Sequence, residues 1–249
     1  MRAAFLLPVL AAPVAAEETA LFQRYLALEG PLDQARTDLA RGRLLEARRG
    51  FEGILRQLPD HSEAHFHMAR LAYAASDFLG ALAHLEVAER SLADLDRRYR
   101  EEVAALKAQA AAEEAAMQTS LDHLTSVADP TGCSAPLFMV KRQALAYLEG
   151  RKSPLHAREN PFGLPAEYPF LRGNALYRLG RREEALAQFR RALALDPVHA
   201  PSWTNLLALL LEARDFGTAR QELARSETLG LRLPPALRQA IQAGGDAPR

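Results

Sequence analysis

The sequence contains little of what catalysis or covalent cross-linking requires. Its 249 residues include one cysteine, Cys133, so no internal disulfide can form. A catalytic thiol would need a histidine partner, and nothing in the sequence places His123 or His156 beside it. We interpret Cys133 as a semi-buried loop thiol. Motifs of zinc proteases, serine hydrolases and phosphate-binding loops are absent from the sequence, so we expect neither an enzyme nor a bound cofactor.

Charge of one sign and aromatic side chains are also scarce. The 31 basic residues balance 31 acidic ones, and aromatic residues make up 7% of the chain. Because no basic patch stands out, we do not expect a nucleic acid partner. A hydrophobic fraction of 49% with so few rings suits helices rich in alanine and leucine, and the chain is long enough to bury a sizeable core.

The N-terminus is apolar but too short to span a bilayer. One positive residue, Arg2, precedes an apolar run from Ala3 to Ala16 that prolines interrupt, and Glu17 follows. This arrangement is typical of a secretory signal peptide, with cleavage expected after Ala16. A hydrophobic N-terminus that is not cleaved is the alternative. No cysteine follows the run, so we expect no lipid anchor and a mature protein that is periplasmic or secreted, not embedded in a membrane.

The sequence does contain a repeated pattern of small and large apolar residues. Ala47 and Ala81 are 34 residues apart, as are Ala185 and Ala219. Twelve residues before these alanines lie Ala35, Ala69, Gly173 and Leu207, and a turn-forming segment separates the two positions each time. Each unit is therefore predicted to be a helix, a tight turn and a second helix. A fixed period of this length indicates stacked repeats rather than one globular core.

This pattern resembles the tetratricopeptide repeat. The best match is "RGNALYRLGRREEALAQFRRALALDP" at 172–197, where Pro197 closes the second helix, followed by a unit with Trp203 at the aromatic position of the family. The resemblance covers roughly residues 28–95 and 166–232. It implies an all-α solenoid of helix-turn-helix units. Pro31 and Pro169 stand where the family usually has an aromatic residue, and His65 substitutes for one.

The middle of the chain breaks the period. Residues 92–124 are predicted to form one long central helix, with apolar residues mostly at steps of three and four: Leu92, Leu95, Tyr99, Val103, Leu106, Ala110, Met117, Leu121 and Leu124. This stripe could pack on neighbouring repeats or pair with a second copy as a homodimeric coiled coil. A further helix is expected at 136–150, before a proline-rich connector. The two repeat pairs are either separate modules or parts of one solenoid with degenerate units between them.

These features divide the chain into five expected segments. They are a signal peptide at 1–16, a repeat pair at 17–95, the long helix, short helix and connector at 96–165, a second repeat pair at 166–232, and a capping helix with a flexible tail at 233–249.

The histidines of "DHSEAHFH" are not predicted to form a metal site. His61 and His65 have a spacing that could hold a metal, but His65 is at the aromatic packing position and His61 is expected at a helix start.

Two of the expected first helices carry side chains that the fold does not demand. One presents Glu63, Phe66, Arg70 and Tyr73, and the other presents Glu167, Phe170, Asn174 and Tyr177 at the same spacing. At about 100° per residue, each set falls on a stripe about 80° wide. The resemblance places these stripes in the inner groove of the family. There, rings could bury apolar side chains of a peptide while Arg or Asn bonds its carbonyls. The alternative is that the rings pack between repeats.

Asn205 completes the set of predicted binding residues. Asn174 and Asn205 match two positions of the clamp with which some members of the family bind a C-terminal carboxylate, although Phe170 replaces the lysine of that clamp. We therefore predict an exported repeat protein that binds a protein or peptide, as a scaffold or adaptor in a cell-envelope complex. The alternative is a structural protein that self-associates through the central helix and has no groove function.

Overall fold

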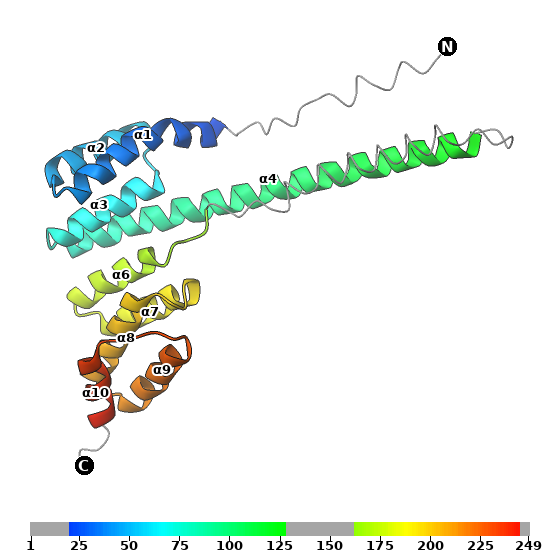
Figure 1. The fold of residues 1–249 in the computed structure, drawn as a ribbon. Helices are drawn as coiled ribbons and strands as arrows, with labels where there is room; N and C mark the ends of the chain where they lie inside the picture. Colours follow the sequence, from blue (N-terminus) through cyan, green and yellow to red (C-terminus); the bar gives the residue numbers. More distant parts are fainter. Residues whose placement is uncertain (1–19, 128–161, 245–249) are drawn as a thin grey trace. The chain divides into compact units, whose positions relative to one another are not determined.

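The computed structural model describes residues 20–127 and 162–244 of the chain (Figure 1). The described residues belong to two compact units: those up to Ser91 and from Pro165 onward form one, and those between Leu92 and Leu164 belong to the other. All regular secondary structure in these residues is helical, and the predicted all-α solenoid is confirmed. None of the described helices combines the length and hydropathy that crossing a bilayer requires.

The first unit consists of helix pairs followed by a short last helix. The pairs are α1 (Ala20–Ala40) with α2 (Leu44–Gln57), α3 (Ser62–Ala74) with the start of α4 (Phe78–Val127), α6 (Glu167–Arg178) with α7 (Arg182–Leu195), and α8 (Ala200–Glu212) with α9 (Phe216–Thr228). We number these pairs as the first to fourth repeats. The helix α10 (Pro235–Ala243) packs on α8 and α9 with Ile241 fully buried.

The repeated small residues explain how the two helices of a pair approach each other. Ala47, Ala81, Ala185 and Ala219 are completely buried. In the third repeat, a Cβ atom added to Gly173 would lie 2.7 Å from a ring carbon of Phe189 on the facing helix. A side chain at that position would therefore force α6 and α7 apart, which is why the sequence pattern requires a small residue there.

The turn inside each repeat places one residue in the left-handed region of backbone space. These residues are Gly42, Ser76, Gly180 and Arg214, with φ between 56° and 77°. They follow the same 34-residue period as the alanines. Glycine adopts this conformation without steric cost, so the turns of the first and third repeats are unstrained. In the second and fourth repeats, Ser76 and Arg214 adopt the same conformation despite their side chains.

The predicted central helix is part of α4, which begins earlier, at Phe78. The second helix of the second repeat and the central helix are thus one continuous helix. Along it, Leu92 and Leu95 are buried, and the ring of Tyr99 packs edge-on against Phe162 with centroids 5.8 Å apart. The short helix predicted at 136–150 and Cys133 lie outside the described residues.

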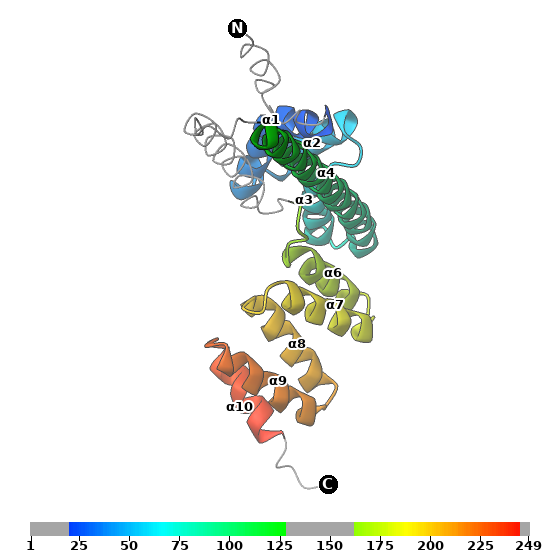
Figure 2. The same ribbon diagram turned by 90° about the vertical axis from the view of Figure 1, so that its right-hand side faces the viewer.

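The second and third repeats are in direct contact although a long stretch of chain separates them in sequence. Phe66 of α3 stacks on Tyr168 of α6, with ring centroids 4.3 Å apart and planes 11° apart. Leu171 of α6 shares a buried cluster with Ala69 and Leu85 of the second repeat. Figures 1 and 2 both show α6 beside the second repeat. The repeat pairs therefore belong to one solenoid, and Leu92–Leu164 is inserted between them.

A carboxylate of α4 reinforces this contact. Glu89 accepts hydrogen bonds from Nε of Arg172 at 2.9 Å and from Nη1 of Arg191 at 2.7 Å. Its side chain is 13% exposed, and that of Arg172 is 20% exposed. Because Arg172 lies on α6 and Arg191 on α7, one side chain of the second repeat binds both helices of the third.

Candidate partner-binding face

The side chains predicted to bind a partner lie on α3, α6 and α8, the first helices of the second, third and fourth repeats. Histidines position two of these helices. The Nδ1 atom of His61 accepts the backbone N–H of Ala64 at 3.2 Å, and that of His199 accepts the N–H of Ser202 at 3.3 Å. Each ring thereby caps the first turn of its helix, α3 or α8. We call the surface they help to build the first-helix face, defined by Arg36, Glu63, Arg70, Asn174, Tyr177, Asn205 and Glu212.

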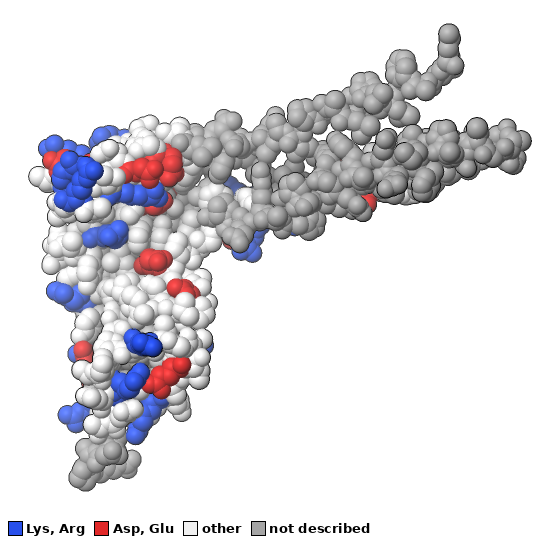
Figure 3. Space-filling view, viewed as in Figure 1, with Lys and Arg blue, Asp and Glu red and all other residues white. Residues whose placement is uncertain are grey.

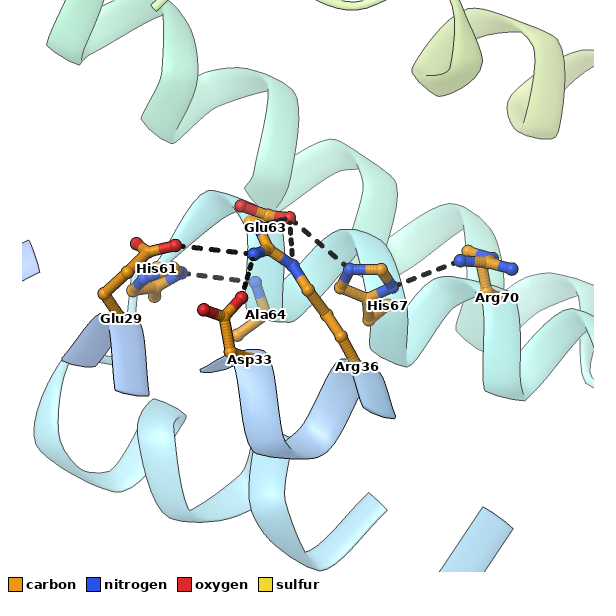
Figure 4. A network of polar contacts seen from close by, with 8 residues as sticks. All are labelled: Glu29, Asp33, Arg36, His61, Glu63, Ala64, His67 and Arg70. Atoms are coloured by element: carbon orange, nitrogen blue, oxygen red, sulfur yellow. Dashed lines mark hydrogen bonds and ion pairs between the residues drawn. The ribbon is translucent and has the colours of Figure 1, made fainter. Parts of the chain in front are cut away.

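An arginine surrounded by carboxylates joins the first two repeats on this face (Figure 4). Nε of Arg36 on α1 donates to Oε1 of Glu63 on α3 at 2.9 Å, and Nη2 contacts the same oxygen. Nη1 of Arg36 donates to Asp33 at 2.7 Å and lies 3.4 Å from Glu29. One guanidinium thus meets three carboxylates, so this part of the face has an excess of negative charge.

Glu63 stays ionised because its partners outweigh its burial. Burial alone would raise the pKa of Glu63, but hydrogen bonds from His67 and Arg36 lower that pKa to about 2. The contacts continue along α3, since Nε2 of His67 lies 3.5 Å from Oε1 of Glu63 and Arg70 lies 3.4 Å from Nδ1 of the same ring. Arg70 itself is exposed. The predicted residues Glu63 and Arg70 are therefore linked through His67.

Three of the four predicted rings are half-buried and contact other rings of the solenoid. Phe66 stacks on Tyr168, as described above. Tyr73 meets Phe78 edge-on at 5.4 Å, and Phe170 meets His199 edge-on at 5.1 Å. These three rings support the packing of the fold as well as part of its surface.

Tyr177 is the most exposed of the four rings, at 37%. Its hydroxyl donates to Oε1 of Glu212 on α8 at 2.7 Å. This hydrogen bond is the main reason that the pKa of Tyr177 is raised. One helix turn away, Nδ2 of Asn205 on α8 donates to Oδ1 of Asn174 on α6 at 2.7 Å. The structure therefore brings together two of the predicted residues, Asn174 and Asn205, and links the third and fourth repeats at two points.

Glu167 stands apart from these pairs. It is exposed in the first turn of α6, where a carboxylate interacts favourably with the helix dipole. Sequence reasoning missed two members of the face, Arg36 and Glu212. Arg36 precedes Arg70 by 34 residues, so the repeat period could have identified it. Glu212 has no counterpart at that spacing, and only its bond to Tyr177 reveals it.

On the face that Figure 3 shows, charges of the described residues are mixed rather than grouped by sign. Figure 3 shows acidic side chains next to basic ones, with uncharged surface between them. Within the described residues, no three histidine, cysteine or acidic side chains are arranged so that they could hold a metal ion. The chemistry available to the face is hydrogen bonding, ion pairing and contact with partly exposed rings.

Comparisons with known proteins agree with this architecture. One profile of the tetratricopeptide repeat matches residues 32–96, and a second matches residues 167–197. Among solved structures, the crystal structure of MamA protein is similar, with a TM-score of 0.51 at 12% identity, over 87% of this chain and 80% of that one. At this identity the likeness shows the fold alone.

Two further solved structures are similar at lower scores. A thermophilic tetratricopeptide repeat protein of Thermus thermophilus has 19% identity and a TM-score of 0.35, over 87% of this chain and 98% of that one. YrrB, described as a repeat protein with an unusual peptide-binding site, has 17% identity and a TM-score of 0.30, over 89% of this chain and 97% of that one. No curated protein matches the sequence.

Proposed function

Because the chain is a tetratricopeptide repeat protein, we propose that it is a scaffold or adaptor that binds a protein or peptide on its first-helix face. The observation that carries this proposal is the set of side-chain bonds between successive first helices: Arg36 to Glu63, Asn174 to Asn205, and Tyr177 to Glu212. The repeat fold needs its small buried residues, but it does not need these polar pairs. They hold polar groups in fixed positions on an accessible surface, which lowers the entropic cost of binding.

The chemistry of the pairs suits an extended peptide. After bonding to each other, Asn174 retains amide donors and Asn205 retains a carbonyl acceptor, so together they can satisfy main-chain groups of a bound segment. Tyr177 offers a ring beside them for an apolar side chain. At the other end of the face, the carboxylates around Arg36 favour a lysine, an arginine or an amino terminus.

We further propose that the protein acts outside the cytoplasm, in a complex of the cell envelope. The support for this location is the N-terminal sequence, in which one positive residue, an apolar run and small residues before Glu17 match a secretory signal. The partner is then an envelope protein, and the solenoid serves as the rigid body that presents the binding face.

Capture from an envelope extract tests the binding proposal. Tyr177→Ala removes an exposed ring and its hydrogen bond to Glu212, so we expect it to lower the free energy of unfolding by about 1 kcal/mol or less. If the ring is a binding hot spot, the same change weakens capture by about 2 kcal/mol or more. Leu195→Ala is the matched control, because it removes a similarly exposed apolar side chain from the second helix of the same repeat. Unchanged capture by both Tyr177→Ala and Asn174→Ala would contradict the proposal.

Molar mass in solution tests the alternative, a structural protein that self-associates through residues 92–124. In that case, a substitution on the partly exposed part of the stripe, such as Met117→Lys, should dissociate a dimer while the first-helix variants leave it intact. A monomeric wild-type protein would remove this alternative.

A further inference from the structure

Two rings hold the same place in the second and fourth repeats. Nε1–H of Trp203 donates to the carbonyl of Pro197 at 2.9 Å, and Nε2 of His65 lies 2.8 Å from the carbonyl of Pro59. Each proline follows the second helix of the preceding repeat, α7 or α2. A carbonyl only accepts, so His65 carries its proton on Nε2. The second repeat thus supplies the required ring N–H from a histidine, a residue type that can gain a second ring proton, whereas the fourth repeat uses a tryptophan, which cannot.

The other ring nitrogen of His65 faces a second histidine. Its Nδ1 lies 2.9 Å from Nδ1 of His84 on α4, and the ring centroids are 5.2 Å apart. Since Nδ1 of His65 has no proton in the neutral ring, His84 must donate the hydrogen bond. One extra proton leaves a hydrogen bond between the rings. It can bind Nε2 of His84, or Nδ1 of His65 if His84 then carries its own proton on Nε2. A second extra proton abolishes this hydrogen bond, because two N–H groups of two cations would then point at each other.

The surroundings of His84 oppose its protonation. Burial and the neighbouring His65 lower the pKa of His84, Arg48 on α2 lowers it further, and only Asp77, just before α4, acts in the opposite direction. His65 is buried. In the fourth repeat, Glu222 holds the position equivalent to His84, so the histidine pair belongs to the second repeat alone.

We infer that the His65–His84 pair is a proton-operated latch that holds α3 against α4 at neutral pH and releases it in mild acid. α3 carries Glu63 and Arg70 of the first-helix face, and its Phe66 stacks on the third repeat. Release of α3 therefore alters one end of the binding face and the contact between the two halves of the solenoid. The effect on a partner rests on the proposed function, but the latch itself does not.

The direction of the pH dependence follows from the protonation states. A free histidine has a pKa of about 6.5, and the fold lowers that of His84. The unfolded chain then binds more protons than the folded one below about pH 6.5, so the stability of the second repeat is full above this pH and falls as the pH drops.

Hydrogen exchange of the α3 amides in the full chain, followed from neutral pH to about pH 5, measures the opening of the latch. All variants are made with His61→Asn, which keeps a side-chain cap on α3 and removes the titration of His61. With both latch histidines present, we expect acid to increase α3 opening, by about tenfold for each pH unit by which the fold lowers the pKa of His84. His84→Gln, which can bond to His65 but does not titrate, should abolish this increase. His199→Asn, a matched change at the cap of α8, should leave it unchanged.

Two results would overturn the inference. One is an acid-induced opening of α3 that persists in His84→Gln. The other comes from the wild-type protein without any substitution, through the nitrogen chemical shifts of its histidine rings. At neutral pH these should show His65 protonated on Nε2 and His84 on Nδ1, and the reverse assignment would exclude the latch. Neither measurement requires a partner, so failure of the binding proposal would not affect them.

Discussion

Replacing Glu89 with glutamine should weaken the junction between the two halves of the solenoid. Glu89 bonds Arg172 of α6 and Arg191 of α7, so Glu89→Gln removes the charge that both guanidinium groups share while preserving the shape of the side chain. Breaking a buried ion pair costs about 3–5 kcal/mol, whereas an exposed pair contributes about 0–1 kcal/mol. Arg172 is nearly buried and Arg191 is 45% exposed, so we expect a loss of about 2–3 kcal/mol.

Urea unfolding followed by circular dichroism measures this loss. Because Glu89 connects two repeats rather than two helices of one repeat, the variant should also unfold less cooperatively, with a lower m-value or two separated transitions. Glu86→Gln is the matched control. Glu86 lies one turn earlier on α4 and pairs with Arg90, and both side chains are well exposed, so its loss should be about 0.5 kcal/mol or less. Equal losses in the two variants would refute the assignment of Glu89 to the junction.

Three further outcomes are expected. Gly173→Ala should lower stability by about 1–3 kcal/mol in thermal melts, because its Cβ would crowd Phe189, while Gly30→Ala, with open space around the new atom, should not. Arg36→Met should raise the pKa of Glu63. In the wild type, ionised Glu63 contributes its full stability above the pKa of the unfolded chain, about 4.5, and this contribution is lost as the pH falls towards 2. The variant should therefore unfold in acid at a higher pH. If the protein is exported as proposed, its intact mass should be that of a chain beginning at Glu17. A cytoplasmic chain that retains Met1 would contradict export.

The repeat pattern made the fold predictable from the sequence. Ala47, Ala185 and Gly173 had recognisable positions because helices that cross closely leave room only for small side chains. The position of Ala47 and Ala185 holds a buried alanine in every repeat, whereas the position of Gly173 is occupied by Leu207 in the fourth. The start of the central helix was harder to locate. The second helix of the second repeat ends without a proline, and its apolar stripe runs on through Leu92 and Leu95, so no local signal separates the two.

The contact between the second and third repeats was not predictable in this way. Phe66 with Tyr168 and Glu89 with Arg172 are pairs between residues far apart in the chain, and no period relates them. The first-helix face was predictable only as single residues. The stripe at 63–73 was recognisable by its spacing, but the partners that hold its members in place, such as Arg36 for Glu63, come from another helix. The sequence also does not show that the half-buried rings of the predicted stripes pack against other rings of the solenoid, because those contacts form only in the folded chain.

The insertion between the second and third repeats has a consequence for how the protein folds. Elsewhere, one repeat follows the last within a few residues, as from α2 to α3. The junction at Glu89 must instead close over the chain from Leu92 to Leu164, a far longer connection, so its formation has a larger entropic cost. Each repeat pair can form from local contacts, so docking of the two pairs should be the late and slow step. The stacked rings of Phe66 and Tyr168 lie at this junction, as does Glu89 with its two arginine partners. Their contacts are the ones that offset the entropic cost of closure.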